Sequence, residues 1–199
     1  MRWHSGLVAL GSVLSCGLAH AQPFDLGRTL SVEFLERLAY PALDGSTVVV
    51  IHAEVGSAMI INRRAGADTV VYIRGDTFLW AQIAEQLPAR SGRGKPIHLD
   101  VRRWILDAGS CPPVENKVAS FLRQLDETLS DLSGASAVKE EIVVDAPTLL
   151  IRMGAKDASV TITPSGALDP PLQQTALELH SVVSRCAGST VPVVEQHDF

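Results

Sequence analysis

The sequence predicts an α+β fold, in which an antiparallel sheet carries helices packed on one face and a disulfide joins two of the helices. Three observations predict this fold. Short segments rich in β-branched residues follow one another in hairpin-like pairs, amphipathic helical segments interrupt them, and two cysteines lie about 75 residues apart. Runs of antiparallel strands broken by helices are typical of α+β domains rather than doubly wound sheets.

The N-terminal 21 residues predict a secretory signal peptide. Arg2 precedes an apolar run of about a dozen residues, and Ala19-His20-Ala21 provides a small-x-small cleavage site. The signal style favours a bacterial protein that is exported to the periplasm and is soluble after cleavage. Residues 13–16 loosely match a lipobox, so lipid anchoring through Cys16 is the minor alternative. No later segment is apolar and long enough to cross a bilayer as a helix.

Charge and composition exclude some classes of partner. The chain has 17 basic and 22 acidic residues, and removal of Arg2 with the signal changes the net charge from −5 to −6. Basic residues gather only at Arg90, Arg93 and Lys95, in a stretch rich in Gly, Ser and Pro. This balance argues against nucleic acid and against anionic membrane surfaces as partners.

The first half of the mature chain predicts a helix followed by strands and a second helix. Leu30, Phe34, Leu35 and Leu38 recur at helical spacing, with Ser31 as its expected N-cap. A turn supplied with glycine at residues 65–68 separates two β-branched segments and predicts a hairpin. The expected strands are 46–55, 58–63, 69–74 and 97 to about 106, and a helix is expected over about 78–87.

The second half repeats a similar order of elements. The strongest helical pattern begins after Cys111 with two prolines and ends at Gly134. Strands are expected at 141–145, 148–153 and 159–163, followed by a helix over about 170–187 and a C-terminal tail over 188–199. We therefore expect one domain over 22–187, and a duplication that relates 46–88 to 140–187 is an open alternative.

The two cysteines of the mature chain, Cys111 and Cys186, predict one intramolecular disulfide, because exported proteins fold under oxidising conditions. Cys111 precedes one predicted helix and Cys186 lies in the last turn of another. The bond would tie the start of one helix to the end of the other, which suits antiparallel helices on one face of a sheet. Free thiols and intermolecular pairing are the alternatives.

The search for chemistry yields one weak constellation. His52 and Glu54, and likewise His98 and Asp100, are spaced two apart on predicted strands, so each pair shares a face. If the two strands were neighbours, these four side chains would suit a zinc ion. The alternative interpretation, which we favour, is that they are polar residues on the outward faces of half-exposed strands. No nucleophile elbow, P-loop or His-Glu-x-x-His motif is present, and the sequence predicts no catalytic residue, metal or cofactor.

The sequence leads to three functional hypotheses. The first is a non-enzymatic envelope protein that binds another envelope or secreted protein, such as a hydrolase inhibitor or a toxin-immunity protein. In that case the loop with Arg90, Arg93 and Lys95 is the expected recognition segment. The alternatives are a small metal-dependent periplasmic hydrolase that uses the four residues above, and a carrier that holds a small ligand between sheet and helices. The sequence does not indicate an oligomeric state.

Overall fold

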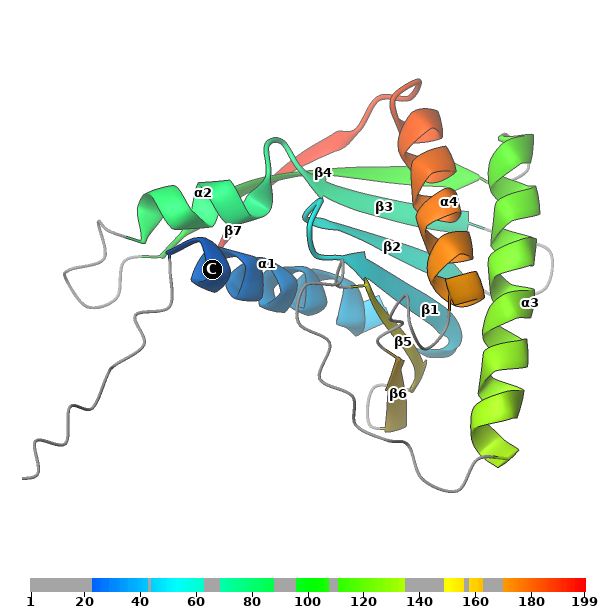
Figure 1. Cartoon of the computed structure of the whole chain (residues 1–199). Helices are drawn as coiled ribbons and strands as arrows, with labels where there is room; N and C mark the ends of the chain where they lie inside the picture. Colours follow the sequence, from blue (N-terminus) through cyan, green and yellow to red (C-terminus); the bar gives the residue numbers. More distant parts are fainter. Residues whose placement is uncertain are drawn as a thin grey trace, which may run out of the picture.

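The described part of the chain forms a seven-stranded antiparallel sheet with helices on both faces (Figure 1). The computed structural model describes residues 23–42, 44–62, 69–87, 96–107, 111–134, 149–155, 158–162 and 170–199. The strand order is β6-β5-β1-β2-β3-β4-β7, and every neighbouring pair is antiparallel. The α+β class and the antiparallel sheet predicted from the sequence are confirmed.

The elements follow the predicted order, apart from the last strand, which was not expected. They are α1 (Pro23–Ala39), a 3-10 turn (Tyr40–Ala42), β1 (Asp44–His52), β2 (Ser57–Asn62), β3 (Thr69–Gly75), α2 (Leu79–Gln86), β4 (His98–Asp107), α3 (Pro112–Gly134), β5 (Leu149–Ala155), β6 (Ala158–Ile162), α4 (Pro170–Ala187) and β7 (Val193–Asp198). α1 begins earlier than expected, so Ser31 lies buried inside the helix rather than at its N-cap. The predicted strand over 141–145 falls outside the described residues.

The prediction that the helices pack on one face is wrong. Figure 1 shows α1 and α2 on one face of the sheet and α3 and α4 on the other. Two separate apolar cores result, one around Phe34, Leu35 and Ile83, and the other around Phe121 and Leu179. The physical reason lies in β1 and β2, whose apolar residues run continuously, so both faces of these strands need covering.

β4 contributes to both cores, because the buried side chains lie on one face of the strand in its first half and on the other face in its second half. Leu99 and Val101 pack under α1 and α2, whereas Trp104 and Leu106 pack under α3 and α4. Arg102 and Arg103 lie between the two sets, and neither is fully buried. The strand therefore joins the two cores at the margin of the sheet.

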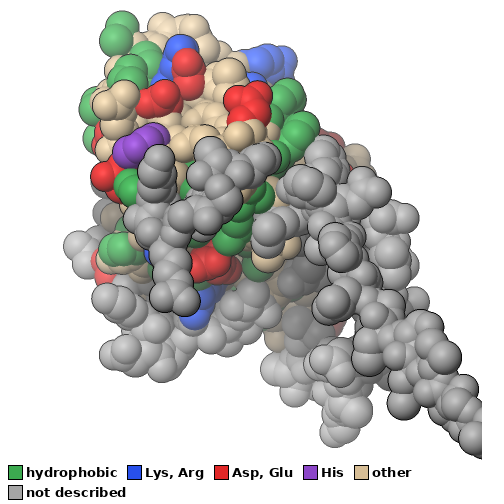
Figure 2. Space-filling view, turned by 90° about the vertical axis from the view of Figure 1, so that its left-hand side faces the viewer, with side chains coloured by type: hydrophobic (Ala, Val, Ile, Leu, Met, Phe, Trp, Pro, Cys, Tyr) green, Lys and Arg blue, Asp and Glu red, His purple; other side chains and the backbone are tan. Residues whose placement is uncertain are grey.

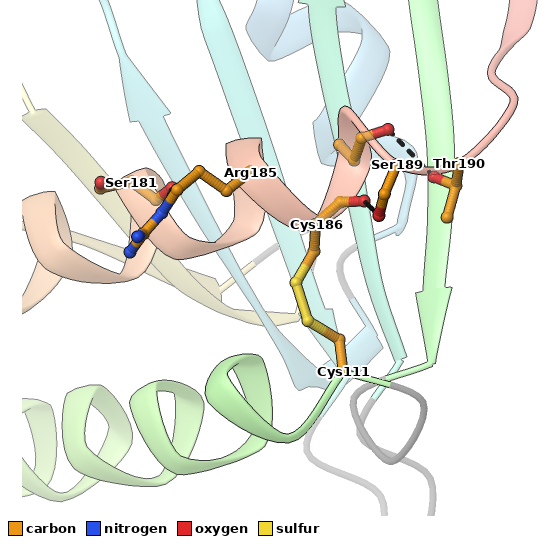
Figure 3. The surroundings of a disulfide bond; sticks show 7 residues. Cys111, Ser181, Arg185, Cys186, Ser189 and Thr190 are labelled. Atoms are coloured by element: carbon orange, nitrogen blue, oxygen red, sulfur yellow. Dashed lines mark hydrogen bonds between the residues drawn. A yellow bond between two sulfur atoms is a disulfide. The ribbon is translucent and has the colours of Figure 1, made fainter.

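The disulfide Cys111–Cys186 is confirmed. The two Cα atoms lie 6.7 Å apart, and the bond joins the residue before α3 to the last turn of α4 (Figure 3). Between the two helices, Lys117 Nζ lies 2.5 Å from a carboxylate oxygen of Glu178. As predicted, α3 and α4 run antiparallel on the same face of the sheet.

The C-terminal residues 188–199, expected to be a tail beyond a domain ending at 187, complete the sheet instead. The main chain turns after α4, where the Ser189 Oγ donates a hydrogen bond to the Cys186 carbonyl (Figure 3). β7 then pairs with β4 along its whole length. At the other end of the strand, Phe199 exchanges two backbone hydrogen bonds with Ile97 and packs edge-on against Phe34.

The suspected duplication stays a prediction. The two hairpins, β2–β3 and β5–β6, both lie in the sheet, but the helices that follow them pack on opposite faces. None of the described helices is long and apolar enough to span a membrane.

Candidate functional site

The four residues considered as metal ligands are not brought together. His52 ends β1 and His98 begins β4, and two strands lie between them. With a spacing of about 4.8 Å between strands, these strands are about 14 Å apart. Among the described residues, no group of three or more His, Cys, Asp or Glu side chains is placed to hold a metal ion.

His98 and Asp100 are exposed surface residues with partners at the sheet margin. His98 Nδ1 lies 2.7 Å from the Asp198 carboxylate, and Asp100 accepts a hydrogen bond from Gln196 at 3.1 Å. Both partners belong to β7. The interpretation of these two residues as outward-facing polar side chains is correct, but for His52 it is wrong.

His52 is instead part of a buried polar cluster beneath α4. The β1–β2 turn, in which Gly56 has a positive φ of 65°, makes His52 and Ser57 direct partners across the two strands. From α4, His180 reaches down onto them, with Nε2 2.8 Å from the Ser57 Oγ and 3.2 Å from the Tyr72 hydroxyl. We call His52, Ser57, Tyr72 and His180 the histidine cluster.

The hydroxyls of the cluster are satisfied, whereas the imidazole of His52 is not. A hydroxyl both donates and accepts, so the contacts to His180 hold in either neutral tautomer. His52 is only 7 % exposed, and neither of its ring nitrogens has a hydrogen-bond partner among the described residues. Its ring lies at right angles to that of His180, with the centroids 5.0 Å apart. Buried polar groups without partners are uncommon and indicate a local energetic cost.

Burial keeps both imidazoles neutral. Desolvation lowers the pKa of His52, and the nearby Glu54 opposes this change. Desolvation also lowers the pKa of His180 to about 4, with further contributions from His52 and from the positive charge of Arg74. A charged imidazole is disfavoured in such a site because the low-dielectric interior cannot replace its hydration.

The Ser57–His180 contact has the distance of a nucleophile and its general base, but the other features of a catalytic site are missing. Ser57 is 1 % exposed, so a substrate carbonyl has no path to its oxygen. In the described part of the chain, no carboxylate hydrogen-bonds to His180 to orient the ring. The geometry therefore describes a packed polar seam between helix and sheet.

Sequence reasoning missed His180 because it weighed histidines only by spacing along strands. A signal was present in the helix itself. Half-buried His180 lies beside Leu172, Ala176 and Leu179 on the side of α4 that faces the sheet, where an apolar residue is expected. A polar side chain on such a stripe needs a partner on the opposite surface, and Ser57 and Tyr72 provide hydroxyls on that face of the sheet.

A shallow depression of about 410 Å³ lies on the other face of the sheet, beside α1. It is lined by Thr29, Val32, Glu33, Glu36, Ala53, Glu54 and Leu150. Two of its carboxylates already have partners, because Glu33 binds Arg37 of α1 and Glu36 accepts a hydrogen bond from the Tyr40 hydroxyl of the following 3-10 turn. The depression is the described feature that comes nearest to the expected ligand cleft.

The expected recognition residues Arg90, Arg93 and Lys95 lie outside the described residues. Comparison of the chain with protein-family models, with curated proteins and with solved structures finds no significant match.

Proposed function

We propose that the mature protein is an exported, non-enzymatic binding module of the bacterial envelope that recognises an extended segment of another envelope or secreted protein. An inhibitor of a hydrolase and an immunity protein against a toxin are the two roles that suit it. The observation that carries the proposal is the outer edge of β7, where a strand edge and exposed apolar side chains coincide.

β7 presents a free edge to a partner. It lies at the end of the strand order, and among the described residues it pairs only with β4. Natural proteins often protect such edges with free charges, yet Glu195 and Asp198 are engaged by Arg103 and His98. The unpaired backbone groups of an edge strand bind an extended peptide by adding it as a further strand.

Apolar side chains surround this edge. Val191, Val193 and Val194 are 94 %, 57 % and 66 % exposed, and Ile105 on the neighbouring β4 is 69 % exposed. Val193 lies opposite Arg103 in the register of β4 and β7, and Ile105 is two residues further along on the same face. Exposed apolar residues that gather rather than scatter indicate a contact surface.

The partner segment we expect is extended and apolar rather than highly charged. Hydrophobic and acidic side chains lie beside one another on the side of the molecule drawn in Figure 2, and the coloured residues there form no broad basic area. With a net charge of −5 for the whole chain, attraction to an anionic polymer is not favoured. Main-chain pairing with apolar contacts above and below the strand is then the main source of affinity.

The experiment is affinity purification of the tagged mature protein from the periplasmic and secreted fractions of its own organism, followed by mass spectrometry. Three baits are compared: the wild type, Val193→Lys/Val194→Lys, and Ala119→Lys as a control on the exposed face of α3. We expect a partner bound near stoichiometrically by the wild type and the control but not by the edge variant. Hydrogen exchange with that partner should then slow at the β7 amides.

Two results contradict the proposal. One is that no partner is enriched by the wild type. The other is a partner that binds the edge variant with unchanged affinity, which would place recognition elsewhere, with the loop of Arg90, Arg93 and Lys95 as the next segment to delete.

A further inference from the structure

The histidine cluster lies where α4 meets the centre of the sheet, so its charge state bears on how firmly α4 is held. Through Ser57 and Tyr72, His180 gives the middle of α4 a polar contact with β2 and β3, beside the apolar contacts of the same helix with the sheet. His52 adds an imidazole from β1 at a centroid distance of 5.0 Å. Two titratable rings thus face each other inside one seam, next to the apolar core of α3 and α4.

The surroundings offer little to stabilise a proton on either ring. β3 contributes Arg74, which has the same sign as an imidazolium, and β2 contributes only the uncharged Ser57. Glu54, in the β1–β2 turn, is exposed and acts on His52 from a distance. Glu178 of α4 forms an ion pair with Lys117 of α3, so its negative charge is neutralised in the helix–helix contact.

We propose that the His52–His180 pair is an acid-sensitive latch, in which protonation of the pair releases α4 from the sheet while the Cys111–Cys186 disulfide keeps the C-terminal end of the helix attached to α3. The latch belongs to the fold and does not depend on the proposed binding role. The disulfide confines the movement, because it joins the last turn of α4 to the start of α3.

The direction of the pH effect follows from proton linkage. In the closed form the pKa of His180 is about 4, below its ordinary value of 6.5. The released helix regains the ordinary value and therefore binds more protons between these two pH values. α4 is therefore held most firmly above about pH 6.5, and its attachment weakens as the pH falls toward 4. Over this range the equilibrium constant for release of α4 should increase roughly 100- to 300-fold, about tenfold for each unit by which the pKa differs between the two forms.

The test is native-state hydrogen exchange of the α4 amides between pH 7 and pH 4, corrected for the intrinsic pH dependence of exchange. The oxidised wild type is compared with His52→Leu/His180→Gln, which cannot be protonated in the seam, and with His98→Gln, which removes an exposed histidine of β4. We expect α4 in the wild type and in His98→Gln to lose protection about 100-fold more than in the double variant. α3 should stay protected in all three proteins.

Equal loss of α4 protection in the wild type and the double variant would overturn the latch. If the double variant does not fold, the NMR titration of the wild-type imidazoles decides. A His180 ring that titrates near pH 6.5 while α4 stays protected contradicts the proposal, whereas one that titrates only together with α4 exchange supports it.

Discussion

At the scale of single residues, His52 and His180 differ although they lie in one cluster. His180 shares its Nε2 with two hydroxyls, so it satisfies groups that would otherwise be buried without partners. His52 has no such bonds and occupies an apolar position with a polar ring. The same substitution at the two positions should therefore change stability in opposite directions.

We expect His52→Leu to raise the free energy of unfolding by about 1 kcal/mol at pH 7, because it removes two buried, unbonded ring nitrogens. His180→Leu should lower it by about 1–3 kcal/mol, because Ser57 and Tyr72 lose their common partner. Urea denaturation of both variants measures the two effects. A His52→Leu variant less stable than the wild type would mean that the imidazole binds a partner, such as a buried water.

The residue scale also shows what the sequence could reveal. The surface position of His98 and Asp100 was predictable, because they alternate with buried Ile97, Leu99 and Val101. The partnership of His52 with His180 was not, because it depends on which strand face α4 covers. That choice is made by three-dimensional packing between segments more than a hundred residues apart.

At the scale of elements, α1 and α2 approach each other closely at one glycine. A Cβ atom added at Gly27 would lie 2.7 Å from the Trp80 carbonyl oxygen, a backbone atom that cannot easily move. We expect Gly27→Ala to lower the free energy of unfolding by about 1–3 kcal/mol through overpacking. Gly188→Ala is the matched control, because its nearest neighbour would lie at an ordinary 3.4 Å.

Thermal or urea unfolding compares these two variants. The control should differ from the wild type by less than about 1 kcal/mol, since its added methyl group meets no clash and reduces the freedom of the unfolded chain. Equal stability of Gly27→Ala and the wild type would show that α1 can move away from α2 without loss.

The disulfide acts between elements as well. Cys111→Ser/Cys186→Ser should lower the free energy of unfolding by about 2–4 kcal/mol, because the bond closes a separation of 75 residues and restricts the unfolded chain. Urea denaturation under non-reducing conditions measures the difference, and reduction of the wild type should reproduce it. Coincident unfolding curves for oxidised wild type and variant would contradict a stabilising role.

Except for β7, which was expected to be a tail, the order and type of the described helices and strands could be predicted from apolar spacing, but their layering could not be read from helix patterns alone. Each helix has one apolar stripe, which predicts that the helix packs against the sheet but does not predict which face of the sheet it covers. The informative segments were Val48–Ile51 and Ala58–Ile61, which are apolar without alternation. Such strands are buried on both faces. The one-face arrangement was expected from the Cys111–Cys186 bond, which constrains only α3 and α4 and carries no information about the face that α1 and α2 cover.

At the scale of the whole molecule, the two cores share one sheet, and two long helical connections pass over the same face of it. α3 carries the chain from β4 to β5 beside β1, and α4 returns it from β6 at one edge to β7 at the other. The last strand thus closes the fold beside β4, whose residues belong to both cores. β7 is at once the end of the scaffold and the proposed binding edge.

Removal of residues 191–199 tests whether β7 belongs to the scaffold. The truncated chain loses the β4–β7 pairing and the packing of Phe199 against Phe34. We expect a decrease of at least about 3 kcal/mol in the free energy of unfolding, the scale of one partly buried aromatic side chain together with several backbone hydrogen bonds.

The control for the truncation is Val191→Ser, which changes an almost fully exposed side chain ahead of the strand and should leave stability within about 0.5 kcal/mol of the wild type. Urea denaturation of both proteins shows whether the C-terminal residues are a dispensable tail or a strand that stabilises the sheet. A tail would be removed without loss, and the truncated protein would unfold like the wild type. A scaffold strand that also binds a partner should lose stability on truncation, whereas Val193→Lys/Val194→Lys should lose binding and keep its stability, because both valines are exposed.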